Sequence, residues 1–217
     1  MKRSFEEEIL DRGRLSPREV ERAHLGLSRT HFLLGNHEAI LRALKSDGQR
    51  VGRVLDIGCG HGGLMKLVQR RLGAEVVGVD LHPPEGGAKR LPILKLDAVR
   101  DALPRADVAV SVCMAHHLRD EQFAEMIENV GRSCRRFIIL DLVRNPVPLA
   151  LFSVFAPLFL QRVNVLDGRQ SIRRAYTPEE FRALIARAVT RVGGSFRHSV
   201  APLWIRQMAE IRYKSIS

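Results

Sequence analysis

The sequence predicts an α/β fold with a largely parallel sheet and a helical segment ahead of it. A short apolar run, a cluster of glycines and a helix-like pattern follow one another over residues 51–68. Further apolar runs alternate with amphipathic segments up to residue 141. Parallel strands that are buried on both faces have near-continuous apolar sequences, and crossover helices join them. Two final runs, 195–200 and 203–211, are expected to form a closing hairpin around Ala201 and Pro202.

The composition favours one ordinary domain. The chain has 217 residues, of which 45% are hydrophobic, and this is enough for a full core. No uncharged apolar run reaches the ~18 residues that a membrane span needs, and the charged start MKRSFEEEIL has no apolar stretch of a secretory signal. Cys59, Cys113 and Cys134 lack paired spacing, so we expect buried thiols in a cytoplasmic protein, with no disulfide framework and no zinc site.

The net charge of +11 raises the question of an anionic partner. The arginines are scattered along the chain, with only short pairs such as Arg70-Arg71. Residues that could stack on bases are few: one Trp, two Tyr and nine Phe, and most of the Phe lie in apolar runs. A surface that binds single strands needs aromatic platforms beside positive charge. Nucleic acid is therefore not the expected partner.

Residues 1–50 are predicted to form an N-terminal helical extension. The stretch Ser16-Pro17-Arg18-Glu19 has the form of a capping box with proline at the first helical position, which predicts a helix over 17–34. Asn36 could cap a second helix that ends near residues 47–48.

The strands are assigned from short apolar runs. The first falls within 51–57, and others are expected at 75–80, 91–96, 106–113 and 137–141. A helix at 121–130 has apolar residues at helical spacing. Another helix should begin at the capping box Thr177-Pro178-Glu179-Glu180 and stop before Gly193.

The glycine turn after the first strand is the strongest functional signal. Four glycines lie at positions 58, 60, 62 and 63, and glycine lets a ligand approach bare main chain. The spacing fits G-x-G-x-x-G, with Asp80 near the ribose-binding distance, so a dinucleotide site stays open. Asp56 argues against that site because its carboxylate would repel a pyrophosphate. The same carboxylate would suit a ligand that carries an amino group and a sulfonium.

The stretch Val54-Leu55-Asp56-Ile57-Gly58-Cys59-Gly60-His61-Gly62 resembles the first motif of the class I S-adenosylmethionine (SAM)-dependent methyltransferases, apolar-apolar-D-x-G-x-G-x-G. The resemblance implies SAM as cofactor. It also implies a Rossmann-like, seven-stranded, mostly parallel sheet with helices on both faces and an antiparallel last strand. The methyltransferase domain would span 51–217. In this family an extension such as 1–50 commonly packs over the cofactor. The alternative is a helix that covers the sheet and has no contact with the cofactor.

The resemblance also implies cofactor-binding residues at the carboxyl ends of the strands. The glycine turn would approach the methionine part, Asp80 the ribose, and Asp97 with Ala98 the adenine. Asp80 could instead start a turn, and Asp97 could cap one. The whole predicted set is Asp56, Gly58, Cys59, Gly60, Gly62, Asp80, Leu81, Asp97, Ala98 and Ser111.

Two adjacent histidines, His116 and His117, follow the fourth strand at the edge where ligands meet an open parallel sheet. Similar small-molecule methyltransferases often have a His-His-Leu-like stretch here. An imidazole can take a proton from a hydroxyl near neutral pH without a large perturbation, so both are catalytic candidates. One could instead cap the next helix while the other packs. No metal site is expected, because adjacent side chains point apart on a strand or a helix.

Residues 146–160 form an uncharged run, PVPLALFSVFAPLFL, that prolines interrupt. We expect a substrate lid within an insertion over 144–176, which would suit an aromatic, polyketide-like or isoprenoid-like acceptor. An ordinary buried helix and a patch that rests on a membrane are the alternatives. Asp167 and Gly168 are expected to form a turn. Candidate substrate contacts are His31, Arg173 and Tyr176. The alternative for Arg173 and Tyr176 is pairing with surface acids and no contact with a substrate.

The predicted function is SAM-dependent methylation of a small, apolar or aromatic acceptor, with O-methylation favoured. An RNA methyltransferase, a nicotinamide-dependent dehydrogenase and a non-catalytic SAM-binding or membrane-associated accessory protein are the alternatives. Steep salt dependence of substrate binding would indicate RNA. Binding of NAD would indicate a dehydrogenase, and liposome binding through 146–160 without turnover would indicate the accessory protein.

Overall fold

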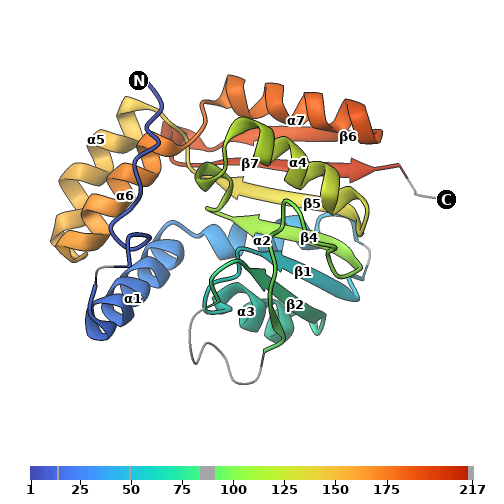
Figure 1. The fold of residues 1–217 in the computed structure, drawn as a ribbon, viewed down its shortest axis with the longest axis horizontal. Coiled ribbons are helices and arrows are strands. Elements are labelled where there is room, and N and C mark those ends of the chain that lie inside the picture. The colour runs from blue at the N-terminus through green and yellow to red at the C-terminus, as the bar shows by residue number, and fades with distance from the viewer. Residues whose placement is uncertain (14, 49, 84–90, 215–217) are drawn as a thin grey trace.

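The structure is a computed structural model that describes residues 1–217 except 14, 49, 84–90 and 215–217. A seven-stranded sheet lies in its middle, in the order β3-β2-β1-β4-β5-β7-β6 (Figure 1). Strands β1 to β5 pair in parallel, and β7 is antiparallel to both β5 and β6. The predicted α/β class, with a mostly parallel sheet and antiparallel closing strands, is confirmed.

The elements alternate along the chain as the apolar runs predicted. The strands are β1 Arg53–Ile57, β2 Glu75–Asp80, β3 Ile93–Lys95, β4 Ala106–Val112, β5 Cys134–Asp141, β6 Gly194–Val200 and β7 Gln207–Tyr213. The helices are α1 Pro17–Leu33, α2 Asn36–Lys45, α3 Gly63–Leu72, α4 Asp120–Gly131, α5 Pro146–Phe155, α6 Arg162–Arg174 and α7 Pro178–Val192. Short 3-10 turns are η1 Ala115–His117, η2 Ala156–Leu158 and η3 Pro202–Trp204.

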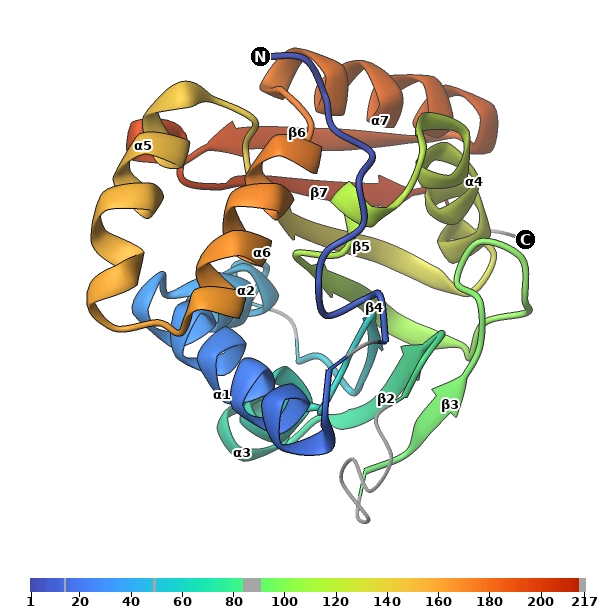
Figure 2. The ribbon, with the colours of Figure 1, turned by 60° about the vertical axis from the view of Figure 1, so that its left-hand side comes forward.

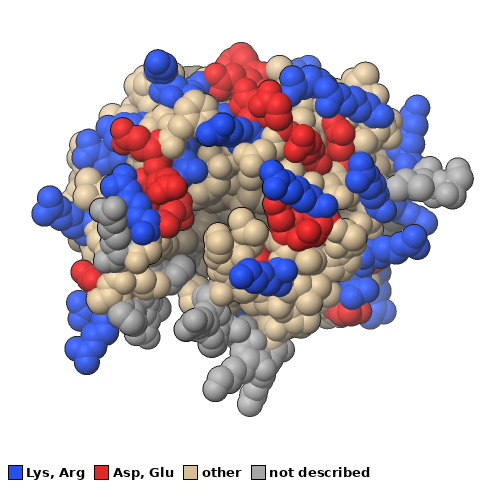
Figure 3. Space-filling model, viewed as in Figure 1, with Lys and Arg blue, Asp and Glu red and all other residues tan. Residues whose placement is uncertain are grey.

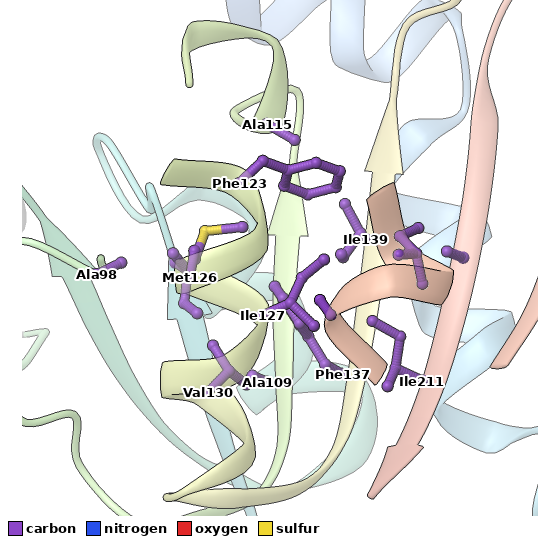
Figure 4. Close-up of a cluster of buried hydrophobic side chains, with 14 of the residues drawn as sticks. Ala98, Ala109, Ala115, Phe123, Met126, Ile127, Val130, Phe137, Ile139 and Ile211 are labelled. Carbon is purple, nitrogen blue, oxygen red and sulfur yellow. The ribbon is translucent and has the colours of Figure 1, made fainter. Parts of the chain in front are cut away.

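Both faces of the sheet are covered, because side chains alternate along each strand. Leu55 and Ile57 of β1 belong to a core with α4 and α7, whereas Val54 belongs to a second core with α2 and α3. Figure 4 shows the first core, where Phe123 of α4 and Phe137 of β5 are fully buried. Burying a phenylalanine contributes roughly 1.5–3 kcal/mol. With both faces occupied, the ends of the strands are left to form a site.

A third group of helices, α1, α5 and α6, lies beyond the carboxyl ends of the parallel strands (Figures 1 and 2). The N-terminal segment runs beside α6 before it enters α1 (Figure 2). Its Ser4 N–H donates to the Arg173 carbonyl, and the N–H groups of Ile9 and Leu10 donate to the Asp167 carboxylate. The start of the chain is thereby attached to α6.

Four local predictions need correction. Asp167 and Gly168 do not form a turn but lie inside α6, where glycine lets α5 approach: a Cβ on Gly168 would lie 2.4 Å from Cζ of Phe152. The strand predicted over 91–96 keeps only three residues, Ile93–Lys95. The last strand begins at Gln207 rather than at residue 203, because η3 turns the chain there with Leu203 at positive φ.

The fourth correction concerns Asn36, which does not cap α2. Gly35 occupies the N-cap position in a left-handed conformation. The Asn36 side chain is buried instead, 3.2 Å from Nδ1 of His31. The predicted start of α1 is confirmed, since the Glu19 carboxylate accepts the Ser16 N–H at 2.8 Å. Within the described residues, no helix combines the length and the apolar character that a membrane span requires.

Candidate active site

One cavity of about 620 Å³ lies at the carboxyl ends of β1, β4 and β5. The glycine turn after β1 forms one end of it. Helices α1, α5 and α6 and the N-terminal segment contribute the rest of the wall. Residues from both the predicted extension, 1–50, and the predicted lid, 144–176, therefore face the same space. The wall includes Glu8, His31, Asp56, Gly58, Cys59, Gly60, His116, His117, Phe152, Phe155 and Phe159.

The glycine turn presents bare main chain at the cavity. Gly58, Gly60 and Gly62 have φ values of 69°, 49° and 70°, in the left-handed region that strains other residues; Gly58 and Gly60 line the cavity, whereas Gly62 does not. A Cβ on Gly58 would lie 2.7 Å from Cγ of Met114, whereas a Cβ on Gly60 would meet no described atom within 4 Å. The turn therefore keeps room for a ligand that approaches the backbone closely.

Asp56 adds an unpaired carboxylate oxygen at this end. The residue is 3% exposed and lines the cavity, and its Oδ2 has no hydrogen-bond partner among the described residues. Burial, together with the nearby charge of Asp80, raises the pKa of Asp56 to about 7. A buried oxygen that the protein leaves unpaired fits a ligand that brings a positive charge to it.

Asp80 braces the turn from β2. Its Oδ2 accepts the Gly60 N–H and its Oδ1 accepts the His82 N–H, both at 2.9 Å. Asp80 and the exposed Leu81 do not line the cavity wall. The carboxylate thus holds the turn that faces the cavity, and its contact with a ribose stays a prediction.

The remaining predicted cofactor residues also lie outside this wall. The Asp97 carboxylate accepts the Val99 N–H at 2.8 Å, which is the capping geometry that the sequence left open. Ala98 is buried in the core beside α4, and Ser111 is a fully buried hydroxyl of β4 without a partner among the described residues. The structure brings together the Asp56 end and the histidines, and it does not bring Asp97, Ala98 or Ser111 to them.

His116 is held in place by Asp141 at the end of β5. The Asp141 carboxylate lies 2.6 Å from Nδ1 of His116 and also accepts the His116 backbone N–H at 2.8 Å. Burial alone would lower the pKa of His116, but the Asp141 and Glu8 carboxylates outweigh it and raise the pKa to about 9. The expectation of an unperturbed imidazole is wrong for this residue.

His117 lies beside His116 rather than pointing away from it. The ring centroids are 4.3 Å apart and the planes differ by 35°. The expected divergence does not occur, because the two residues belong to the 3-10 turn η1 and not to a strand or an α-helix. Nδ1 of His117 lies 3.5 Å from Asp11 Oδ2, and its side chain is 32% exposed. The two imidazoles form one unit.

Glu8 completes this unit, and it belongs to none of the motifs recognised in the sequence. Its Oε1 lies 3.7 Å from Nε2 of His116 and 3.9 Å from Nε2 of His117, and it accepts the Ser171 hydroxyl at 2.7 Å. Burial would raise the pKa of Glu8, but both imidazoles and the Ser171 hydroxyl hold it below its usual value. The only sequence signal was the acidic run at residues 6–8.

The predicted substrate contacts separate in the structure. His31 lines the cavity and stacks on His37 with ring centroids 5.3 Å apart. Burial, with the neighbouring His37 and His116, lowers the pKa of His31 to about 4, so the ring is neutral. Arg173 and Tyr176 do not line the cavity. The Tyr176 hydroxyl donates to the Leu118 carbonyl at 2.9 Å.

The remaining wall is apolar. Phe152 and Phe155 of α5 face the cavity, as do Phe159 directly after η2 and the leucines Leu151 and Leu160. Phe155 and Phe159 are also about half exposed, at 52% each. The cavity therefore offers a hydrophobic side that continues to the surface of the molecule.

A family model described as a methyltransferase domain matches residues 29–146. Among curated proteins, a ubiquinone biosynthesis O-methyltransferase of Ruegeria sp. (strain TM1040) is 30% identical over 160 residues, which cover 68% of this chain and 64% of that protein. A protein of the same description from Cereibacter sphaeroides (strain KD131 / KCTC 12085) is 31% identical over 154 residues, 63% of this chain and 59% of the relative. The chain thus spans about three fifths of the length of these relatives.

Solved structures share the fold. The plantazolicin methyltransferase BpumL, in complex with a monoazolic desmethylPZN analog and SAH, superposes with a TM-score of 0.69 at 16% identity, over 91% of both chains. Human N-acetylserotonin methyltransferase in complex with SAM gives a TM-score of 0.64 at 19% identity, over 90% of this chain and 56% of that one.

Proposed function

Because the chain belongs to the class I SAM-dependent methyltransferases, we propose that it methylates a hydroxyl group of a small, apolar or aromatic acceptor. One observation carries the proposal: a single cavity joins the glycine turn to a histidine–carboxylate cluster and to an apolar wall. A cofactor end, a proton-accepting end and a hydrophobic side are the parts that O-methylation of such an acceptor requires.

The glycine-turn end fits SAM, which supplies a methyl group on a positively charged sulfur. The bare main chain of Gly58 and Gly60 leaves room for the methionine part. The unpaired Asp56 oxygen suits its amino group. We place the ribose and the adenine near Asp80 and Asp97, on the strand ends next to β1, as the resemblance implies.

The acceptor is placed between the two ends. The phenylalanines of α5 and η2 would bury its apolar part and exclude water, which aligns its hydroxyl for an in-line displacement. The curated relatives are named as ubiquinone biosynthesis O-methyltransferases, which supports oxygen as the methylated atom. We treat helices α5 and α6 as the lid and the N-terminal segment, attached to α6, as its partner.

The hydroxyl proton is lost at the cluster of Glu8, His116 and His117. His116 is buried and its Nδ1 is engaged by Asp141, so its part is to position the cluster. His117 faces the cavity with a side chain that is 32% exposed, and we assign it the role of proton acceptor.

Contact with a lipid surface is a second proposal. Four apolar residues between 52% and 77% exposed lie in or directly after α5 and η2, and two of them also line the cavity: Val154, Phe155, Leu158 and Phe159. An exposed apolar surface that continues into a cavity suits an acceptor dissolved in a membrane.

Figure 3 shows lysines and arginines interspersed with acids on the face drawn, which favours a small acceptor over RNA.

Calorimetric titration of the purified chain with SAM, SAH and NAD in parallel tests the cofactor. Micromolar binding of SAM and SAH without NAD binding is the expected result. Phenolic and lipid-like acceptors are then screened by SAH formation, with methyl-ether products identified by mass spectrometry. Binding of NAD alone would overturn the proposal, and turnover that yields only N- or C-methylated products would overturn the choice of oxygen.

A further inference from the structure

Three potential ligand atoms converge at the histidine end of the cavity. The Glu8 carboxylate and one nitrogen from each of His116 and His117 all lie within 4.8 Å of one another. Glu8 Oε1 is 3.7 Å from Nε2 of His116 and 3.9 Å from Nε2 of His117. Two ligand atoms that share a zinc ion at about 2.1 Å in tetrahedral geometry are about 3.4 Å apart. The two distances to Glu8 exceed this separation by a few tenths of an ångström, so the carboxylate oxygen is already close to the place of a shared ligand atom.

The opposite nitrogen of each ring faces a carboxylate. Asp141 Oδ1 lies 2.6 Å from Nδ1 of His116, and Asp11 Oδ2 lies 3.5 Å from Nδ1 of His117. A carboxylate at one imidazole nitrogen favours the proton there and leaves the lone pair of the other nitrogen for a metal. Metal-binding histidines in proteins have this arrangement, and here both rings have it.

An unsatisfied buried atom points independently to a ligand. Nε2 of His116 has no hydrogen-bond partner among the described residues, although the side chain is only 2% exposed. A buried polar atom without a partner is costly, and a cation would satisfy it.

The charge around the cluster favours a cation. Among the described residues, the ion pairs of Glu8 and Asp11 with a guanidinium are those of Arg174, whose NH1 is 3.4 Å from Asp11 and 4.0 Å from Glu8; Asp141 pairs with His116. A cation at Nε2 would take the place of the proton that these carboxylates favour on His116, and without that proton the three carboxylates outnumber the guanidinium.

We propose that Glu8, His116 and His117 bind a divalent first-row transition-metal cation at the acceptor end of the cavity. Two imidazoles and one carboxylate are a donor set for Zn²⁺, Fe²⁺ or Co²⁺, and imidazole disfavours Mg²⁺ and Ca²⁺. Three protein ligands leave coordination positions for an oxygen of the acceptor. The sequence predicted no metal site because the two side chains were expected to point apart, whereas their ring centroids lie 4.3 Å from one another.

A cation at the cluster would change how the hydroxyl loses its proton. A metal bound to both Nε2 atoms takes the lone pairs that a histidine base would need. A hydroxyl oxygen bound to the cation would release its proton to water more readily, because the cation stabilises the negative oxygen. This catalytic use rests on the proposed function, whereas the binding of the cation does not.

Metal titration of the chelator-treated, full-length chain in the absence of SAM tests the site. We expect one Co²⁺ per chain, with the visible absorption of a nitrogen- and oxygen-ligated ion, and its displacement by Zn²⁺. Glu8→Gln and His117→Asn should each weaken the affinity at least tenfold, and folding is checked by circular dichroism. His198→Asn, on β6 and hydrogen-bonded to Gln207, is the matched control and should bind as the parent chain does.

The outcomes separate the cation from the cofactor. Absence of saturable Co²⁺ and Zn²⁺ binding would overturn the metal site, and so would equal affinity in the parent, Glu8→Gln and His117→Asn chains. A SAM titration of the same chelator-treated protein is read separately. SAM binding without metal binding would contradict the metal site and leave the proposed function standing. Metal binding without SAM binding would contradict the proposed function and leave the metal site standing.

Discussion

At the glycine-turn end of the cavity, neighbouring residues from 56 to 60 supply the wall, whereas at the other end Glu8, His116 and Asp141 come from three distant parts of the chain. The first end is a local shape of strand, turn and helix. The second exists only when the N-terminal segment lies against α6 and brings Glu8 over η1. One end of the site is thus formed by a local sequence motif, and the other end by contacts between distant segments. The two ends should respond differently to mutation.

The largest expected effect separates chemistry from cofactor binding. His117→Asn should lower kcat about 10²- to 10⁴-fold, since the cluster loses either its proton acceptor or a cation ligand. The Kd for SAM should stay within about twofold, because the glycine-turn end is untouched. Initial rates of SAH formation and calorimetry measure the two quantities. His198→Asn should leave both unchanged, and a parallel loss of SAM affinity in His117→Asn would show that the two ends are not separable.

The second effect isolates the glycine turn. Gly58→Ala should weaken SAM binding about 10- to 100-fold, because the left-handed backbone strains a side chain by about 1–2 kcal/mol and the new Cβ would lie 2.7 Å from Cγ of Met114. Gly48→Ala is the matched control, with φ of 67° and no described atom within 4 Å of its Cβ. Calorimetry and urea unfolding should show lost stability in both variants and lost affinity only in Gly58→Ala.

This difference between the two ends also explains what the sequence could predict. Hydrophobic periodicity and the glycine motif identified the fold, the turn and Asp56, because these depend on residues that are neighbours in the chain. The contact of Glu8 with His116 depends on how the first residues dock on α6, for which no periodicity exists.

Two positions show packing that the sequence does not reveal. Gly168 was predicted in a turn but lies in α6, where the Phe152 ring occupies the space of a side chain. Tyr176 was a candidate substrate contact, and its ring lies under the Arg3 guanidinium, 3.7 Å from the ring centroid. Both depend on packing partners that are distant in sequence.

The third effect is a pH dependence of SAM binding. Burial and Asp80 raise the pKa of Asp56 to about 7, so the free chain holds a proton there below that pH. A bound amino group favours the carboxylate, and affinity should therefore fall about tenfold for each pH unit below 7 and level off above it. Asp80 and the Cys59 thiol are the titratable groups that interact with Asp56. Calorimetry from pH 5.5 to 8.5 measures the slope.

The stability of the free chain should depend on the same ionisation of Asp56, but it should fall as the pH rises, whereas the affinity for SAM should increase. The folded pKa of Asp56 lies above its unfolded value, so its contribution to stability is present below about pH 4 and is lost as the pH rises through 7. Asp56→Asn should remove this loss and flatten the affinity profile. An unchanged slope in Asp56→Asn would assign the pH dependence to another group.

The smallest expected effect concerns the outer surface of the apolar wall. Leu158 is 77% exposed on η2 and does not line the cavity, so Leu158→Ser tests lipid contact without changing the site. Each inserted CH₂ contributes about 0.8 kcal/mol, and loss of one partly inserted leucine should lower binding to phosphatidylcholine–phosphatidylglycerol vesicles about threefold to tenfold. Leu94→Ser, on strand β3 and 42% exposed, is the control. Equal vesicle binding by both variants would contradict the lipid contact, because a contact through η2 must depend on its most exposed side chain. The apolar wall would then serve only to hold the acceptor.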